Sequence, residues 1–506
     1  MPAAVDARAA RNSPDRRFFR DDMPRDEMDA AGGEEDEQTD GGPRPRYYPG
    51  PPGGNGRGQN GGGYRRPKAQ LNSAPLTTGA VPDLRPTQAP MVITAPVAAA
   101  NAALPAPVLR RLSSEEDPYD SVGTRAGSFV IKGAVELSSG YDTNPARLSK
   151  PVSAPAFVVA PELLVISDWD RHALVADLRG AFNGYGGTFP TLINGMASPE
   201  PTSVDRPSFN GHVDGRFDVT RDLRLTSQLR LTVGTDDPGS PNIQRGLAAY
   251  PIYTTAGATI GIDRSFNRLD VSLGATADRT SFTQSRLSDG ALMSNDDRNY
   301  DQYGGVGRIS YELNPGLKPF VEVEGDTRSH DLAVDRNGYQ RDSSGGYAKA
   351  GASFDISRIL TGEVSIGYIG RTYVDPRLPR LEGMLTSASL VWRASALTTV
   401  KLLADTQIAE TTLPVSAGTM VRTYAVEVDH DFRRWLTGIG KLSYGTYDYQ
   451  GANRNDDLWS IEGGLVYKLN RNVWIKSTLR HDILNSNVPG ASARATVVML
   501  GVRLQN

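Results

Sequence analysis

The sequence predicts an all-β fold: a transmembrane antiparallel β-barrel of about 18 strands, with 16 as the alternative, over residues 126–506, preceded by a long disordered region over 1–125. Three observations lead to this prediction. Apolar and polar residues alternate with a period of two along most of the chain after residue 128, as in strands with one apolar face. Short and long connections between the expected strands alternate along the chain. No segment is apolar enough for a membrane-spanning helix.

The composition distinguishes a membrane barrel from a helical membrane protein. Hydrophobic residues make up 38% of the chain, and the mean hydropathy is -0.40. No run approaches the roughly 20 apolar residues that a spanning helix needs. A barrel strand presents only every second side chain to lipid, so a polar average is compatible with a membrane barrel. The net charge of -3, without Lys/Arg clusters among aromatics in the periodic region, argues against nucleic-acid binding.

The first 125 residues differ from the rest in composition. A mixed-charge run over 6–40 is followed by a Gly/Pro/Arg tract over 41–68 and an Ala/Pro/Thr stretch over 74–107. Their apolar surface is too small to offset chain entropy, so we expect a disordered periplasmic spacer. The alternative is an arm that contacts peptidoglycan or a periplasmic partner. Residues 1–20 lack the apolar segment of a secretory signal peptide, so we expect that segment upstream, unless the barrel prediction is wrong.

Strands are expected where apolar and polar side chains alternate. Over 223–234, for example, Leu229 and Leu231 alternate with Gln228 and Arg230, so one face of the strand is apolar and the other is polar. The pattern predicts an even number of strands, as in single-chain bacterial outer-membrane barrels. They are expected over 128–137, 157–167, 172–185, 208–219, 223–234, 252–263, 269–282, 300–313, 317–328, 347–356, 361–373, 383–393, 398–410, 421–431, 436–449, 458–469, 473–484 and 494–504.

The connections between these strands alternate in length. Short turns are expected over 168–171, 264–268, 314–316, 357–360, 394–397, 432–435 and 470–472. Long polar links are expected over 186–206, 235–251, 283–299, 329–345, 374–382 and 411–419. In outer-membrane barrels the short turns are periplasmic and the long loops extracellular, whereas soluble β-sandwiches do not keep this order over a whole domain.

Aromatic residues near the strand ends predict girdles at the two membrane interfaces. Any β-rich protein also enriches aromatics in its strands, so this observation supports a barrel only together with the alternation. The expected girdle residues include Trp169, Phe182, Phe266, Tyr311, Phe320, Trp392, Phe432, Trp435, Tyr444, Tyr447 and Trp474.

Ionisable residues recur on the strand face opposite to the apolar one. Each would cost roughly 2 to 4 kcal/mol at the lipid midplane, so these side chains must face water or one another. We therefore expect a polar lumen, which in a ring of about 16 to 18 strands is too wide for side chains alone to fill. The alternative for any single residue is that it only braces and solvates the wall. The predicted lumen-lining residues are Lys132, Glu136, Asp177, Arg179, Asp214, Arg216, Arg224, Arg230, Glu322, Glu324, Glu363, Arg371, Lys401, Asp405, Glu427, Lys476 and Arg480.

The sequence offers no motif for catalysis or metal binding. The five histidines share no metal-ligand spacing, and the absence of cysteine removes disulfides, thiolate sites and a lipid-modified anchor. A GxSxG elbow and a Walker-type phosphate loop are also missing. The segment 331–342 contains Asp335, Asn337 and Asp342 near Gly338, but it matches too few positions of a calcium loop, so polar turn chemistry is preferred. We therefore predict no cofactor, no metal and no enzymatic activity, with a lumenal enzyme as a weaker hypothesis.

Several short sequence words lie in the connections. They are GYDTNP at 140–145, SDW and RHAL within 167–174, DRNGY and RDS within 335–343, DPRLP at 375–379 and ETT at 410–412. These words resemble the putative β-barrel porin 2 family, and the resemblance covers about 128–506 without the N-terminal region. It implies an outer-membrane protein of Gram-negative bacteria. Some members of the family are associated with the production of surface polysaccharide, and no substrate is established for it.

Two functions are compatible with these features. The first is an outer-membrane pore, either passive for small solutes or serving the export of surface exopolysaccharide. The second is a non-conducting structural barrel that presents extracellular loops and a periplasmic arm. The expected partners are outer-membrane lipid and lipopolysaccharide, with a polysaccharide or small solute as cargo.

Overall fold

The computed structural model describes residues 119–506, except 190–191, 194–195, 198–200, 245 and 357–358. The predicted disorder over 1–118 therefore lies outside the described residues. Residues 119–125, which their composition assigned to the N-terminal region, are described: Thr124–Ala126 forms the short strand β1, which pairs with residues 129–131. Ordered β-structure thus begins slightly before the predicted boundary at residue 126.

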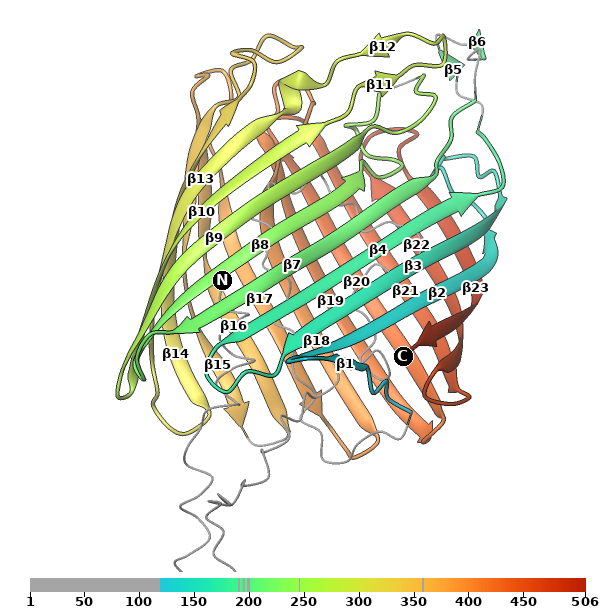
Figure 1. Cartoon of the computed structure of the whole chain (residues 1–506). Helices are drawn as coiled ribbons and strands as arrows, with labels where there is room; N and C mark the ends of the chain where they lie inside the picture. Colours follow the sequence, from blue (N-terminus) through green and yellow to red (C-terminus); the bar gives the residue numbers. More distant parts are fainter. Residues whose placement is uncertain (1–118, 190–191, 194–195, 198–200, 245, 357–358) are drawn as a thin grey trace, which may run out of the picture. The chain divides into compact units, whose positions relative to one another are not determined.

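Eighteen long strands form one closed antiparallel ring, as predicted (Figure 1). Each long strand pairs with the next along the chain, and the last pairs with the first, from Ala134 opposite Gln505 to Asp142 opposite Val497. The strands are β2 (Phe129–Asp142), β3 (Ala154–Ser167), β4 (Ala173–Tyr185), β7 (Arg206–Asp218), β8 (Leu223–Thr235), β9 (Ile252–Phe266), β10 (Leu269–Phe282), β13 (Tyr300–Tyr311), β14 (Leu317–His330), β15 (Ser343–Ile356), β16 (Leu360–Tyr373), β17 (Leu381–Arg393), β18 (Thr398–Ala409), β19 (Gly418–Arg433), β20 (Leu436–Gln450), β21 (Arg454–Lys468), β22 (Val473–Ser486) and β23 (Ala493–Gln505).

The two ends of the ring differ in their connections. At the short-turn end, at the bottom of Figure 1, tight turns join the strands; the two-residue turn after β9 has Asn267 at a φ of 58°, a conformation that asparagine tolerates. The opposite end, called the long-loop end, carries most of the long connections. It also carries four two-residue strands and a 3-10 turn, namely β5 (Leu192–Ile193), β6 (Met196–Ala197), β11 (Ser285–Arg286), β12 (Leu292–Met293) and η2 (Asp296–Arg298). One connection at this end, residues 451–453, is short.

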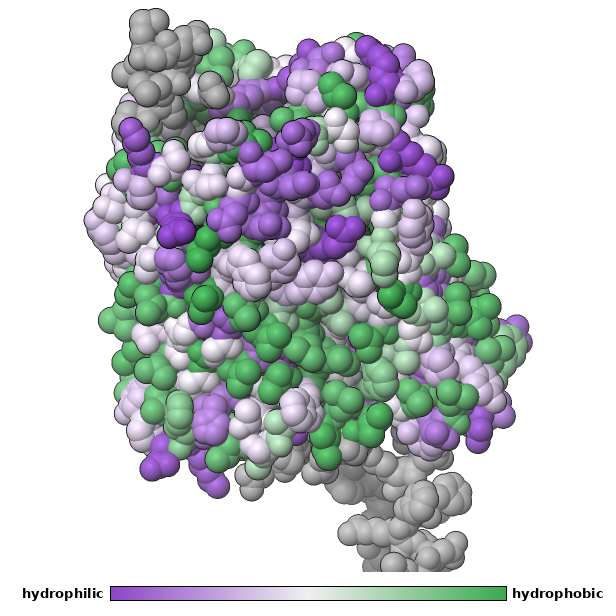
Figure 2. Space-filling view, turned by 180° about the vertical axis from the view of Figure 1, so that it is seen from behind, coloured by the Kyte–Doolittle hydropathy of each residue, from purple (hydrophilic) through white to green (hydrophobic). Residues whose placement is uncertain are grey.

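The outer and inner faces of the ring differ in polarity. In β14, Val321 and Val323 are 55% and 53% exposed, whereas Glu322 and Glu324, which alternate with them, are buried. On the face seen in Figure 2, a broad apolar band (green) crosses the lower half of the barrel and a hydrophilic zone (purple) lies above it. No helix among the described residues is long and apolar enough to cross a membrane. The exposed apolar side chains of the outer face, such as Val321 and Val323, are of the kind that lipid-facing barrel strands present.

Exposed aromatic side chains border the apolar band. Tyr311 and Tyr467 lie beside the short turns, while Tyr303 and Trp459 lie eight residues further up the same strands. At about 3.3 Å per residue and a strand tilt of about 40°, eight residues span roughly 20 Å along the barrel axis. This separation is close to the apolar height of outer-membrane barrels, about 25 Å.

Three of the expected girdle residues are not girdle residues. Phe320, Tyr447 and Trp474 are 3%, 1% and 0% exposed, and their positions alternate with outward-facing neighbours. Trp474 donates its indole N–H to the carbonyl of Asn470 at 3.1 Å. The prediction used distance from the strand end alone, whereas the parity of the position decides whether a ring faces lipid or the interior.

Several strands extend further than predicted at the long-loop end. β2 continues to Asp142 instead of ending at residue 137, and β15 begins at Ser343 instead of residue 347. The exposed residues in these extensions are polar or amphipathic: Ser139 and Tyr141 in β2, and Ser344 in β15. Because neither face needs to be apolar there, the alternation ends before the strand does.

Candidate functional site: the barrel interior and its mouth

All seventeen predicted lumen-lining residues lie in barrel strands, on the face opposite to the exposed apolar side chains, and none of them is exposed. Their role in lining a solute pathway stays a prediction. The buried members are Lys132, Glu136, Asp177, Asp214, Arg216, Glu322, Glu324, Arg371, Lys401, Glu427 and Arg480, and the half-buried members are Arg179, Arg224, Arg230, Glu363, Asp405 and Lys476.

Most of these charges form ion pairs. Lys401 Nζ lies 2.9 Å from a carboxylate oxygen of Glu427 and 2.9 Å from one of Asp429. Lys476 Nζ lies 2.6 Å from Glu136 Oε2, so this pair links β22 to β2 across β23. A buried charge without a partner costs several kcal/mol, so each pair makes both of its members tolerable in the interior.

Other predicted residues are paired within one strand, between neighbouring strands, across β9 in the case of Arg230 with Asp278, or with Asp120, which precedes β1. These pairs are Arg179 with Asp177 (2.6 Å), His212 with Asp214 (3.4 Å), Arg216 with Asp218 (3.1 Å), Arg224 with Asp218 (3.8 Å), Arg230 with Asp278 (2.6 Å), Arg480 with Asp482 (2.8 Å) and Lys132 with Asp120 (3.8 Å). Among the described residues, Glu324 and Asp405 form no ion pair within 4.0 Å, and Glu324 Oε2 accepts no hydrogen bond.

A four-strand network crosses the wall from β13 to β16. Arg308 lies 3.3 Å from Glu322 and 2.7 Å from Glu363, and Lys349 lies 3.0 Å from Glu322. The hydroxyl of Tyr347 donates to Glu322 at 2.7 Å. Because each carboxylate has a cation beside it, the network fixes the wall and leaves little unbalanced charge.

Sequence reasoning missed Arg308, Lys349 and Asp278 as members of these networks. Gly307 lies beside Arg308 and alanines lie on both sides of Lys349, and these small residues conceal the period of the two strands. Arg308 is six positions after Gln302, and Lys349 is two positions after Tyr347. Residues an even number of positions apart lie on the same face of a strand, so this spacing could have identified Arg308 and Lys349 as inward-facing.

A long loop crosses the mouth of the barrel at the long-loop end. It joins β8 to β9 over residues 236–251, after the fifth strand of the ring, and it contacts the β18–β19 connection, after the thirteenth of 18 strands. Asn242 Oδ1 accepts hydrogen bonds from Thr411 Oγ1 at 3.0 Å and from the Thr412 N–H at 2.9 Å. The two connections are nearly opposite in the ring, so the loop spans the opening.

The β14–β15 loop reaches the same connection. Asn337, in the β14–β15 loop, donates its amide to the Thr412 carbonyl at 3.0 Å. Arg341 donates to the Ser416 carbonyl at 2.8 Å and to the carboxylate of Asp335 at 2.8 Å. Two loops from separate parts of the ring, β8–β9 and β14–β15, therefore meet the β18–β19 connection.

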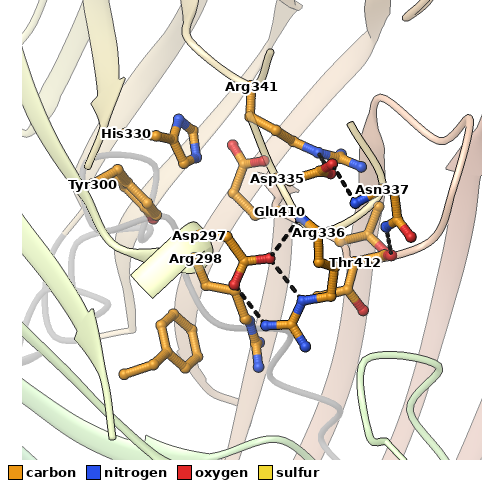
Figure 3. Close-up of a pocket in the computed structure, with 12 residues that line it drawn as sticks. Asp297, Arg298, Tyr300, His330, Asp335, Arg336, Asn337, Arg341, Glu410 and Thr412 are labelled. Carbon is orange, nitrogen blue, oxygen red and sulfur yellow. Dashed lines mark hydrogen bonds and ion pairs between the residues drawn. The ribbon is translucent and has the colours of Figure 1, made fainter. Parts of the chain in front are cut away.

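A small pocket lies between these loops (Figure 3). Its volume is about 30 Å³, enough for about one water-sized group. The lining residues come from the ends of β10, β13 and β14 and from the three connections that follow β12, β14 and β18: Phe282, Asp297, Arg298, Tyr300, His330, Asp335, Arg336, Asn337, Arg341, Glu410, Thr411 and Thr412. Figure 3 shows Glu410 lying between His330 and the ion pair of Arg341 with Asp335.

Two of the pocket's carboxylates, Asp297 and Glu410, are stabilised in their charged form. Burial by itself raises the pKa of Asp297, but hydrogen bonds from the Arg336 guanidinium at 2.6 and 2.7 Å outweigh it and lower the pKa below its usual value. Burial also raises the pKa of Glu410, and the positive charge of Arg328 outweighs it, so the pKa of Glu410 is lowered. The polar interactions at the mouth therefore involve charged groups at neutral pH.

The described residues contain no group of three or more His, Cys, Asp or Glu side chains that could hold a metal ion. In the segment considered as a calcium loop, Asp335 Oδ1 accepts the backbone N–H groups of Asn337 at 2.8 Å and Tyr339 at 2.9 Å. The turn chemistry preferred for Asn337 and Gly338 is confirmed, because the Asp335 carboxylate is used within the turn.

Comparison with known proteins gives one family and several distant likenesses. The family model described as "Putative beta-barrel porin 2" matches residues 117–506. A curated protein, the cell surface hyaluronidase of Danio rerio, is 26% identical over 135 residues, which cover 24% of this chain and 9% of that protein.

Solved structures match at lower identity. The siderophore receptor PiuA from Acinetobacter baumannii is 9% identical at a TM-score of 0.40, and the match covers 76% of this chain and 82% of that one. The outer membrane protein OpdK from Pseudomonas aeruginosa is 13% identical at a TM-score of 0.37, over 74% of this chain and 99% of that one. A BenF-like porin from Pseudomonas fluorescens Pf-5 is 11% identical at a TM-score of 0.37, with the same coverage of 74% and 99%.

Proposed function

The chain belongs to the family described as "Putative beta-barrel porin 2", and on this premise we propose that it is a narrow channel for small hydrophilic solutes across the bacterial outer membrane. The observation that carries the proposal is the polarity of the closed ring: its outer face is apolar and its inner face is ionic. Ionic side chains are costly in lipid, so an inner face of this kind is suited to water and dissolved solutes. The long-loop end is then extracellular.

The mouth limits what such a channel admits. The loop over 236–251 spans the opening, and the pocket between the meeting loops holds about 30 Å³. Small solutes suit this opening better than a polymer, whose export would require a much wider separation of the loops. We therefore prefer passive entry of small solutes to export of exopolysaccharide. Interior carboxylates paired with Lys or Arg also favour a transport role over catalysis.

Conductance of the full chain in planar lipid bilayers tests the proposal. We expect small, steady unitary steps, because the loops narrow an opening that the ring alone would leave wide. A heat-denatured sample at the same concentration is the control for detergent artefacts. Bilayers that contain folded protein and show no steps would overturn the channel.

A second function, a non-conducting structural barrel, is favoured by one observation. Eleven of the seventeen inward charges are buried, and loops from separate parts of the ring meet over the mouth. The same bilayer measurement decides between the two, because a structural barrel stays silent even after its loop contacts are weakened.

A further inference from the structure

A polar cluster lies in the wall directly below the loops. The mouth cluster, as we call it, consists of Gln302, Asp326, Arg328, Arg371, Tyr373 and Glu410. Strand register aligns three of its members in one row: Gln302 is opposite Arg328, Arg328 is opposite Ser343, and Ser343 is opposite Tyr373. In the next row, Asp326 is opposite Gly345, and Gly345 is opposite Arg371. Glu410 follows the end of β18 and completes the cluster.

The four charged members form two ion pairs. Arg328 pairs with Glu410, and its Nε donates to Gln302 Oε1 at 2.9 Å. Arg371 pairs with Asp326 across Gly345. A Cβ at Gly345 would lie 3.1 Å from Arg371 Cζ and 2.8 Å from the Gly370 carbonyl oxygen, so glycine makes room for this pair. The cluster carries two positive and two negative charges, and its net charge is zero.

The pairs leave one polar atom on each member without a hydrogen bond. Gln302, Arg328 and Arg371 are at most 1% exposed, and Asp326 is 8% exposed. Buried polar groups in native proteins almost always have a partner, so unpartnered atoms in one place indicate a missing one. The atoms without a partner are Gln302 Nε2, Arg328 Nη2, Arg371 Nε, the Tyr373 hydroxyl, Asp326 Oδ2 and Glu410 Oε2.

The missing partner must both donate and accept hydrogen bonds. Arg328 Nη2 and Arg371 Nε can only donate, whereas the carboxylate oxygens of Asp326 and Glu410 can only accept. An anion would meet an unpaired carboxylate oxygen, and a cation would meet an unpaired guanidinium N–H. A hydroxyl group satisfies either kind of atom without adding charge to a neutral cluster.

We propose that the mouth cluster is a binding site for a neutral, hydroxyl-rich solute, a sugar or sugar alcohol. The proposal rests on the proposed channel, because it assigns a solute class to the opening below the loops. The pocket above the cluster shares Glu410 with it and provides the approach from the long-loop end. The solute reaches the cluster when the loops at the mouth move apart, since the pocket itself holds only about 30 Å³.

Saturation-transfer NMR on the full chain in detergent measures this binding without requiring an open pore. The probes are maltose and sorbitol, with succinate and putrescine as the charged comparison. We expect saturation transfer to both neutral probes and none to the charged ones. If folded protein transfers saturation to neither maltose nor sorbitol, water alone satisfies the cluster and the proposal is wrong.

A pair of tyrosine variants locates the site. Tyr373→Phe removes a hydroxyl that has no partner, so we expect unchanged thermal stability and roughly fivefold weaker maltose binding. Tyr347→Phe is the matched control, because the hydroxyl of Tyr347 already donates to Glu322 at 2.7 Å; we expect lower stability and unchanged binding. Equal affinities of wild type and Tyr373→Phe would place the sugar elsewhere and overturn the assignment.

The two proposals fail separately. Unitary conductance without sugar binding removes the mouth cluster as a site and leaves the channel. Sugar binding without conductance leaves the site and removes the channel. If both hold, millimolar maltose is expected to reduce the channel current in wild type and to reduce it less in Tyr373→Phe.

Discussion

At the scale of single residues, the interior is governed by charge pairing. Lys401, Glu427 and Asp429 are at most 3% exposed, and the lysine lies 2.9 Å from each carboxylate. Removing one member of such a group leaves the others charged and unbalanced, which costs far more than the intact group contributes. Each buried charge of the interior therefore needs its partner of opposite charge for the folded barrel to be stable.

Replacing Lys401 tests this dependence. Lys401→Met leaves two buried carboxylates without their cation, so we expect a loss of about 3 to 5 kcal/mol in the free energy of unfolding. The measurement is urea unfolding in lipid vesicles, followed by tryptophan fluorescence. Lys150→Met, at an exposed loop position, is the control and should change stability by less than about 0.5 kcal/mol. Similar unfolding midpoints for the two variants would contradict the pairing argument.

The carboxylates at the mouth predict an acid-sensitive loop. Hydrogen bonds from Arg336 lower the pKa of Asp297 despite its burial, and hydrogen bonds from Arg279 lower that of Asp331. A folded-state pKa below the unfolded value of about 3.9 gives stabilisation that is complete above that value and is lost as the pH falls through the folded pKa. The β14–β15 loop should therefore stay attached at pH 5 and loosen only below about pH 4.

A nitroxide label measures this attachment. The chain has no cysteine, so Val334→Cys gives a single labelling site on the β14–β15 loop. We expect constant label mobility from pH 7 to 5 and a rise below about pH 4. Asp297→Asn should be mobile at pH 7 already. A rise between pH 7 and 5 would show that these carboxylates do not hold the loop.

At the scale of strands, parity decides the environment of a side chain. Leu229 of β8 is 59% exposed, whereas Gln228 beside it is half-buried and donates to Asp214 at 2.8 Å. The alternation of such neighbours made the strands and their inward charges predictable from sequence. It could not predict the ends of β2 and β15, where both faces are polar, nor the inward rings of Phe320, Tyr447 and Trp474, for which position along the strand was used in place of parity.

Arginine substitutions at two adjacent positions of β8 compare the free-energy cost of a cation on the outer face with its cost on the inner face. Leu229→Arg places a cation among acyl chains in the middle of β8, so we expect a cost of about 2 to 4 kcal/mol. Gln228→Arg places the same side chain on the inner face, beside Asp214 but also beside Arg230, which donates to Gln228 Oε1 at 3.2 Å, and it should cost less than Leu229→Arg. Folding into vesicles at increasing urea concentration measures both. Equal costs at the two positions would contradict the assignment of the lipid-facing side.

At the scale of the molecule, closure of the ring and closure of the mouth have different origins. The strands close through backbone pairing of β2 with β23, which the count of strands and their alternation predicts. The mouth closes through side-chain contacts between residues far apart in the chain, such as Asn242 with Thr411. No local pattern marks Asn242 as a partner of a threonine 169 residues away, so this part of the site could not be derived from sequence.

Asn242→Ala tests the closure of the mouth. The substitution removes the acceptor for the Thr411 hydroxyl and the Thr412 N–H, so the loop over 236–251 loses these hydrogen bonds to the β18–β19 connection. We expect a higher or more fluctuating unitary conductance with unchanged barrel stability. Gln244→Ala, in the same loop, is the control, because Gln244 Oε1 accepts no hydrogen bond. A silent bilayer with Asn242→Ala would support the structural barrel in place of the channel.

The short strand β1 has a consequence for assembly. β23 ends opposite Ala134, so residues 129–131 of β2 would have a bare backbone edge if β1 did not pair with them. The N–H of Gly123 also donates to the carbonyl of Asn506 at 3.1 Å, which joins β1 to the end of the last strand. A chain shortened to begin at residue 127 would have an open strip at its seam, free to recruit a strand from another polypeptide. By this pairing β1 covers the backbone edge at the seam of the ring.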